Sequence, residues 1–303
     1  MGESALKVSF EVLTCFRYIV FLPKDKFVGQ SIKLYGEYGE GMIDIFRCFV
    51  TEGDHILDVG ANIGAFTVPL AQFVGQSAGR VYAFEWQRPV FQMLNANVMI
   101  NNLANVVTYH TAVGDTNEGY FLQNPFKSQY MVNHVLPGNV KAEHTQWAKD
   151  TIRVSRMAID SLELPCEVLQ GLPEHRAPSS TQPTLSFVKI SVVGQESQVI
   201  HGLLDTLDRC KPVVYFQQGH TDREIRTLLE PLGYRWWFVH VSSLFNPNNF
   251  FGVNENKLMV SVPMVIAAPF DISVDYIQTF GRGRPNWSVR EYALESTPQR
   301  NDN

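Results

Sequence analysis

The sequence has few cysteines, and none in the spacings that hold metals or form redox pairs. Cys15, Cys48, Cys166 and Cys210 are scattered over 303 residues, with no C-x-x-C and no cysteine–histidine pair at metal-ligand spacing. We therefore assign no metal ligands. The pattern is typical of reduced, mostly buried thiols, so we expect a reducing compartment.

A long hydrophobic run and an excess of basic residues are also missing. The apolar stretch VLTCFRYIVFL (12–22) is short for a membrane span, and Arg17 interrupts it. The formal net charge is −5, which offers no electrostatic basis for nucleic-acid binding. We expect a cytoplasmic protein with no nucleic-acid or membrane partner, and the sequence does not indicate an oligomeric state.

The composition that is present favours a folded core, since 45% of the residues are hydrophobic and only 18% are charged. Strand-like and helix-like segments alternate, which predicts an α/β fold with a mostly parallel central sheet flanked by helices. Predicted strands lie at 55–60, 80–85, 106–113, 187–193, 212–217, 234–241 and 257–266, and predicted helices at 41–50, 65–74, 89–100, 195–208 and 222–232.

The same patterns divide the chain into three parts. Residues 1–50 form an N-terminal segment with a lid-like helix, and residues 51–280 form the main domain. The stretch 163–185 is rich in proline and serine and is predicted to be an inserted surface loop. Residues 281–303 are predicted to be a polar, frayed tail.

A glycine-containing turn, DVGANIG (58–64), closes the first predicted strand and opens a helix. Glu85 ends the second strand, 21 residues after Gly64, where a carboxylate binds ribose hydroxyls. Asn62 stands where a dinucleotide fingerprint needs a glycine, and its side chain would crowd a diphosphate. The turn therefore favours S-adenosylmethionine over NAD, with a ligand-free turn as a third reading.

Several motifs in this order resemble the FkbM-type methyltransferases. They are YGEYGE (35–40), LDVGANIGAFT (57–67), the segment 82–106, TAVGD (111–115), AIDSL (158–162), FVKISVVGQE (187–196) and NPNNFFG (246–252). The resemblance covers roughly residues 30–265. It implies a Rossmann-like class I methyltransferase fold, S-adenosyl-L-methionine as cofactor, and O-methylation of sugars or small molecules.

The resemblance also implies roles for single residues. Asp58, Gly60, Asn62 and Gly64 would shape the cofactor turn, and Glu85 would bind the ribose. Two further cofactor-binding residues are predicted with an alternative left open for each. Trp86 either stacks on the adenine or packs under the turn, and Asp115 either lies near the adenine or caps a strand.

The departures from the family pattern fall on the presumed reaction centre. The family's fourth strand typically reads IKIDVEGxE, whereas this chain has Ser191 for the aspartate and Val193 for the first glutamate. Gln217 stands where the fifth strand often ends in glutamate. None of the three replacements is a general base at neutral pH.

Another group must then assist a hydroxyl acceptor, or activity is impaired. The candidate catalytic residues are His220, Glu196, Ser191 and Gln217, with His134 and Tyr38 as further bases. A solvated loop is the commoner explanation of a histidine such as His220, and a helix N-terminus explains Glu196. Lys189 either points inward toward the positions of the missing acids or, as we expect, snorkels from its strand.

We therefore predict an S-adenosylmethionine-dependent methyltransferase that acts on a hydroxyl of a small molecule or glycan. The alternative is a cofactor-binding protein with impaired catalysis, and an NAD-dependent oxidoreductase is less favoured because of Asn62.

Overall fold

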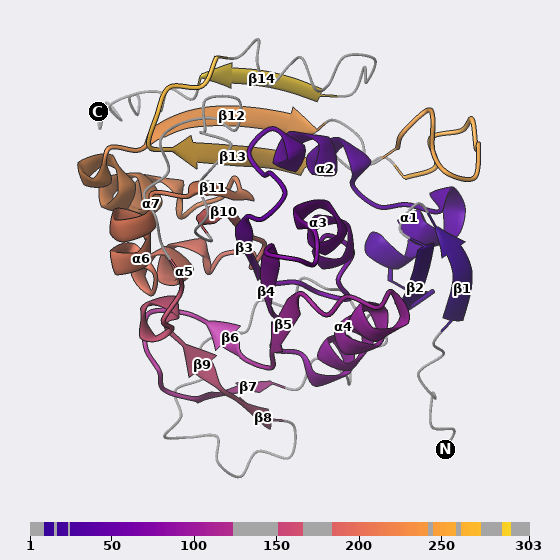
Figure 1. The fold of residues 1–303 in the computed structure, drawn as a ribbon, viewed down its shortest axis with the longest axis horizontal. Helices are drawn as coiled ribbons and strands as arrows, with labels where there is room; N and C mark the ends of the chain where they lie inside the picture. Colours follow the sequence, from indigo (N-terminus) through magenta and orange to yellow (C-terminus); the bar gives the residue numbers. More distant parts are fainter. Residues whose placement is uncertain are drawn as a thin grey trace, which may run out of the picture.

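The computed structural model describes residues 9–14, 17–23, 25–123, 151–165, 184–241, 245–258, 262–273 and 287–291. Within them, an eight-stranded sheet has the order β14-β12-β13-β11-β10-β3-β4-β5 (Figure 1). The predicted α/β fold is confirmed. The strands are β3 (His55–Val59), β4 (Arg80–Phe84), β5 (Val106–Tyr109), β10 (Leu185–Ile190), β11 (Val213–Gln217), β12 (Arg235–Val241), β13 (Val262–Ala268) and β14 (Trp287–Glu291).

The five strands β5, β4, β3, β10 and β11 are all parallel to their neighbours. β13 runs antiparallel to both β11 and β12, and β14 is antiparallel to β12. The carboxyl ends of the parallel strands therefore meet at one edge of the sheet, which is where ligands bind in open α/β folds.

Helices cover both faces of the sheet because its strands are apolar on both sides. Phe187 and Tyr215 point into a core with the first group of helices, and Val188 and Phe216 point into a core with the second. Figure 1 shows the two groups on opposite sides of the sheet. The first group is α2 (Glu40–Arg47), α3 (Thr67–Val74) and α4 (Arg88–Ile100), and the second is α5 (Glu196–His201), α6 (Leu204–Cys210) and α7 (Asp222–Leu229).

The remaining elements are small. The apolar N-terminal stretch forms a hairpin of β1 (Ser9–Thr14) and β2 (Arg17–Phe21), which is followed by α1 (Val28–Tyr35). None of the helices in the described ranges has the length and apolar content to cross a membrane. The others are β6 (Ala112–Val113) with β9 (Arg156–Met157), β7 (Tyr120–Gln123) with β8 (Thr151–Val154), and the 3₁₀ turns η3 (Ile159–Ser161) and η5 (Glu230–Leu232).

Five expectations are corrected by the structure. The helix predicted at 195–208 is two helices, α5 and α6. The strand predicted at 187–193 ends at Ile190, and the one predicted at 106–113 is split into β5 and β6. The strand predicted at 257–266 begins at Val262. The predicted tail also contains β14, and most of the predicted insertion lies outside the described residues.

The expectation of free thiols is wrong for Cys210. Cys210 at the end of α6 is disulfide-bonded, whereas Cys48 is a free, buried thiol. The expectation of a reducing compartment therefore loses part of its basis.

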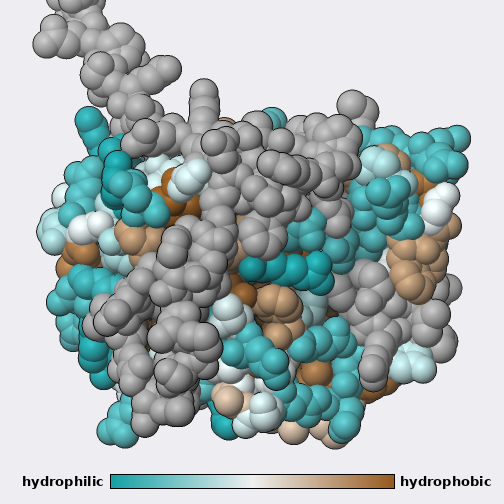
Figure 2. Space-filling model, turned by 45° about the horizontal axis from the view of Figure 1, so that its top comes forward, coloured by the Kyte–Doolittle hydropathy of each residue, from teal (hydrophilic) through white to brown (hydrophobic). Residues whose placement is uncertain are grey.

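The face shown in Figure 2 is mainly polar where it is described. On the face shown in Figure 2, hydrophilic residues cover most of the described surface, and apolar residues form only small separate areas. Five large apolar side chains are exposed in the described part of the chain: Phe73, Met99, Ile100, Phe250 and Phe251.

Candidate functional site: a cofactor turn and an edge without free acids

The turn after β3 has the backbone that its glycines require. Gly60, Asn62 and Gly64 have positive φ values of 73°, 55° and 89°. A Cβ on Gly60 would lie 2.2 Å from the carbonyl oxygen of Ser191, so this position accepts only glycine. The N–H groups of Gly60 and Ala61 both donate to the carbonyl of Phe84 and join the turn to the end of β4.

Glu85 lies directly against this turn. Its Oε2 accepts the Asn62 N–H at 3.0 Å, and its Oε1 accepts the Gln87 N–H at 2.7 Å. Burial raises the pKa of Glu85 to about 7, against the opposing effect of these N–H groups and of Lys189. The backbone of Trp86 also interacts with this carboxylate, which leaves about one of its four acceptor positions for a ribose hydroxyl. The residues present fit a nucleoside-containing cofactor.

The other predicted cofactor-binding residues, Asn62, Trp86 and Asp115, differ in their exposure and in their contacts. Asn62 turns its Oδ1 back to the N–H of Ile63, 2.6 Å away, and its amide nitrogen has no partner in the described structure. Trp86 is half-buried and stacks on no ring of the described residues. Asp115 is exposed and pairs with Arg156 at 3.1 Å. Their roles toward a cofactor stay predictions.

Asp58 is fully buried beneath the turn. Its Oδ1 lies 2.8 Å from the Nζ of Lys189, which also donates to the carbonyl of Gly60, and its Oδ2 accepts the hydroxyl of Thr67. Lys189 is only 2% exposed and lies over the ring of Phe66. The expectation that Lys189 snorkels to solvent is therefore wrong. Its charge is neutralised locally, and it holds the backbone of the turn from below.

Ser191 and Gln217 are neighbours at the carboxyl edge of the sheet. Ile190 is paired with Phe216 across β10 and β11; Ser191 directly follows β10, and Gln217 is the last residue of β11. Both are half-buried, and neither side chain forms a hydrogen bond within the described structure. Val193 follows in the turn and is also half-buried. The positions of Ser191 and Gln217 are thus adjacent at the ends of paired strands, and Val193 lies two residues beyond Ser191.

Glu196 and His220 lie near this edge but differ in exposure. Glu196 is 2% exposed at the start of α5, where its Oε2 accepts the Thr221 hydroxyl at 3.4 Å, and burial raises its pKa. His220 is exposed in the loop after β11 and has no partner in the described structure. Burial also raises the pKa of Tyr38, which disfavours it as a base, and His134 lies outside the described residues.

The YGEYGE and NPNNFFG motifs are in direct contact. The N–H of Phe250 donates to Glu37 Oε2, and the N–H of Phe251 donates to the carbonyl of Tyr35. Phe250 and Phe251 are each exposed by about two fifths at this contact. Both motifs are visible in the sequence, but no spacing or periodicity indicates that they touch.

The sheet order, the reversed β13 beside β11 and the glycine turn after β3 define a Rossmann-like class I methyltransferase fold. The family model described as the methyltransferase FkbM domain matches residues 58–236. The chain belongs to the FkbM methyltransferase family, as its motifs had suggested. The cofactor of this family is S-adenosyl-L-methionine. No curated protein matches the chain significantly.

Solved structures with similar folds are distant. The FkbM methyltransferase from Methylobacillus flagellatus KT is 14% identical, with 72% of this chain and 44% of that chain covered and a TM-score of 0.41. The S-adenosylmethionine-dependent O-methyltransferase from Thermotoga maritima is 15% identical, with 84% and 74% covered and a TM-score of 0.45. The chain spans less than half of the first of these proteins, and the family assignment rests on the family model.

Proposed function

We propose that this chain is an S-adenosylmethionine-dependent O-methyltransferase whose acceptor is an oxygen, hydroxyl or already ionised, of a small molecule or sugar. The observation that carries the proposal is the contact of Glu85 with the N–H of Asn62, which joins a ribose-binding carboxylate to the glycine turn. When bound, the cofactor supplies an electrophilic methyl group on a sulfonium. The protein then has to hold the acceptor oxygen close to it and aligned with it.

Calorimetry tests the cofactor. We expect S-adenosylmethionine and its demethylated product, S-adenosylhomocysteine, to bind, and NAD not to bind. Glu85→Gln should weaken binding of the product by about tenfold, because charge-assisted hydrogen bonds contribute about 1.5–3 kcal/mol. Glu52→Gln, an exposed carboxylate before β3 at the opposite edge of the sheet, serves as the control. Binding of NAD alone would overturn the proposal.

A catalytically impaired cofactor-binding protein is the second candidate. Ser191, Val193 and Gln217 favour it, because none of them replaces a carboxylate base. Methyl transfer from radiolabelled S-adenosylmethionine to any acceptor would exclude this candidate. Tight cofactor binding without transfer across a broad acceptor panel would support it.

The compartment is a separate proposal. The sequence-based expectation is the cytoplasm, with no nucleic-acid or membrane partner, whereas the disulfide of Cys210 is typical of oxidising compartments. Thiol labelling of Cys210 in fractionated cells decides between them. A labelled thiol in the cytoplasmic fraction supports the first.

A further inference from the structure

Four described carboxylates at or just beyond the carboxyl ends of the parallel strands form contacts with other protein groups. Asp58 binds Lys189 and Thr67, and Glu85 accepts two backbone N–H groups. Glu196 accepts the Thr221 hydroxyl, and Asp222 accepts the N–H of Gly219. Each of these acids is therefore already engaged in a contact that holds the site together.

Ser191 and Gln217 present neutral donors at the same edge. A serine hydroxyl and a glutamine amide both donate hydrogen bonds, and neither side chain is engaged within the described structure. Carboxylates at these two positions would repel an anion, whereas a hydroxyl and an amide can bind one. With Ser191 and Gln217 in place of carboxylates, this edge of the sheet can bind a negatively charged ligand.

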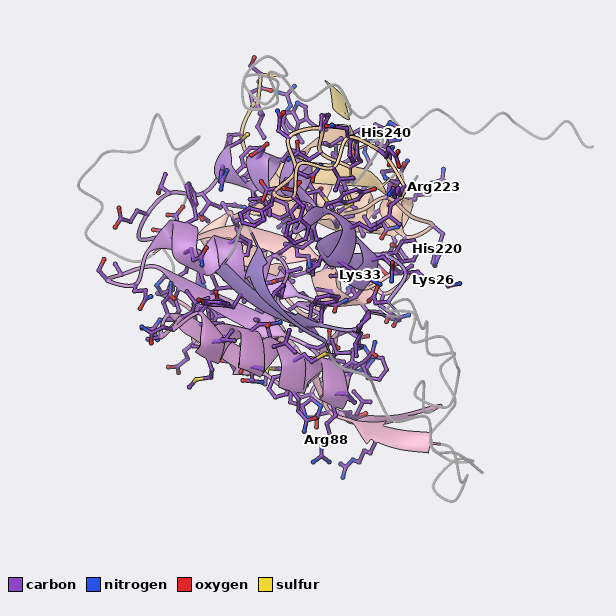
Figure 3. All side chains as sticks on the ribbon, turned by 90° about the vertical axis from the view of Figure 1, so that its right-hand side faces the viewer. Lys26, Lys33, Arg88, His220, Arg223 and His240 are labelled. Atoms are coloured by element: carbon purple, nitrogen blue, oxygen red, sulfur yellow. The ribbon has the colours of Figure 1, made fainter. Side chains whose placement is uncertain are left out.

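Three basic side chains follow the ends of the parallel strands, where α7 also carries Asp222 and Glu224. Arg88 begins α4 just after β4, while His220 and Arg223 follow β11, so all three lie at the carboxyl edge of the sheet. In Figure 3, His220 and Arg223 lie close to one another, and Arg88 lies apart from them at the bottom of the view. Each is exposed, and none forms an ion pair within the described structure. This basic rim contrasts with a formal net charge of −5 for the whole chain.

We propose that the acceptor is a carboxylate, on a small organic acid or an acidic sugar, and that the product is its methyl ester. This inference rests on the proposed function. A carboxylate has a pKa of about 4 and is already ionised at neutral pH, so its oxygen needs no general base. An aliphatic hydroxyl would need one, and the missing base would cost it about 10²–10⁴-fold in rate.

Transfer of the methyl group to a carboxylate requires no proton transfer. One oxygen of the carboxylate forms the new C–O bond to the methyl group, while the bond from that carbon to the sulfonium sulfur breaks. The electron pair of the broken bond goes to sulfur, which becomes a neutral thioether. The negative carboxylate and the positive sulfonium become a neutral ester and S-adenosylhomocysteine. The hydroxyl of Ser191 and the amide of Gln217 orient the second carboxylate oxygen.

Matched acceptor pairs test the inference: glucuronate against glucose, and benzoate against benzyl alcohol. The protein is first saturated with S-adenosylhomocysteine, and binding of each probe is measured by calorimetry. We expect each carboxylate to bind at least tenfold more tightly than its neutral partner. Turnover with labelled S-adenosylmethionine should give a methyl group that alkali releases as methanol, as an ester does. Equal affinities within each pair, or an alkali-stable methyl ether, would overturn the inference.

Charge variants separate this inference from the proposed function. Gln217→Glu and the double change Arg88→Glu, Arg223→Glu should each weaken carboxylate binding at least tenfold while S-adenosylhomocysteine still binds. The control for Gln217→Glu is Gln198→Glu on α5. The control for the arginine changes is Arg80→Glu at the start of β4, which lies at the opposite edge of the sheet. They should bind carboxylates like the wild type. Failure to bind S-adenosylhomocysteine in the wild type would overturn the proposed function and this inference with it.

Discussion

Asp58 and Lys189 form an ion pair that water cannot reach, since the two side chains are 0% and 2% exposed. A buried pair gains little over an apolar pair of the same size, but removal of one partner leaves an isolated buried charge. The second bond of Lys189, to the carbonyl of Gly60, gives the pair a role in holding the cofactor turn.

We predict that Lys189→Met destabilises the protein by about 3–5 kcal/mol, because Asp58 then lacks its counter-charge. Urea unfolding followed by fluorescence measures the loss. The double variant Asp58→Asn, Lys189→Met should recover part of it, which a simple packing defect at residue 189 would not allow. Additive losses in the two single variants would contradict the prediction.

Glu85 couples pH to cofactor binding. Burial raises its pKa to about 7, so between pH 8 and pH 6 the carboxylate changes from mostly ionised to mostly protonated. A protonated carboxyl is a poorer acceptor for ribose hydroxyls, and affinity for S-adenosylhomocysteine should fall by about tenfold over this range. Calorimetry at several pH values checks this, and Glu85→Gln should show a much flatter profile.

The stability of the cofactor-free protein should change in the opposite direction. The pKa of Glu85 is higher in the folded state than its ordinary value of 4.5, so the folded state binds the proton more tightly. Its contribution to stability is fully present below about pH 4.5 and is lost as the pH rises through about 7. The difference in unfolding free energy between wild type and Glu85→Gln should therefore shift with pH in this window. No shift would contradict the raised pKa.

Among the elements, the N-terminal hairpin is attached to α4 by two asparagine side chains. Asn97 is fully buried, accepts the N–H of Val20, and donates to the carbonyls of Val20 and Ile63. Asn101 makes a similar pair of bonds to Tyr18. These amides pair with β2 as a further strand would, and Asn97 connects the hairpin to the cofactor turn.

We predict that Asn97→Ala loosens both attachments, because it leaves buried backbone groups of Val20 and Ile63 without partners. Each such group costs about 1–3 kcal/mol. Hydrogen exchange should accelerate at residues 17–21 and 62–64. Asn95→Ala, on the same helix but bonded to Phe91 and Thr108, is the control and should leave β2 protected. Faster exchange confined to α4 would contradict the prediction.

The elements that the sequence predicts well have a strong local pattern, such as the continuously buried strand β3 and the amphipathic helices α4 and α7. The break between α5 and α6 was missed because its cause is not local. A Cβ at Gly202 would lie 1.8 Å from the carbonyl oxygen of Gly114, so the chain must come close to a distant segment there. The buried position of Lys189 likewise depends on a distant residue, Asp58, which is 131 residues away in the sequence. The cofactor turn, in contrast, is predictable because its glycines and Glu85 belong to one βαβ unit.

At the scale of the whole molecule, the net charge and the basic rim act on an anionic acceptor over different distances. The formal net charge of −5 repels anions, and this repulsion extends about 30 Å at 0.01 M salt. At 0.15 M salt the screening length is about 8 Å, so an approaching carboxylate responds mainly to nearby Arg88 and Arg223. Still higher salt screens the rim as well.

We therefore predict that kcat/KM for a carboxylate acceptor passes through a maximum as salt is raised from about 0.01 M to 1 M. A neutral acceptor should show no maximum.

Arg80→Glu makes the net charge more negative without touching the rim, so it should lower kcat/KM at low salt and leave the value near 0.15 M unchanged. The double change Arg88→Glu, Arg223→Glu should remove the maximum. A steady decline with salt in the wild type would mean that the rim dominates at every distance, and a steady rise would mean that the rim contributes nothing.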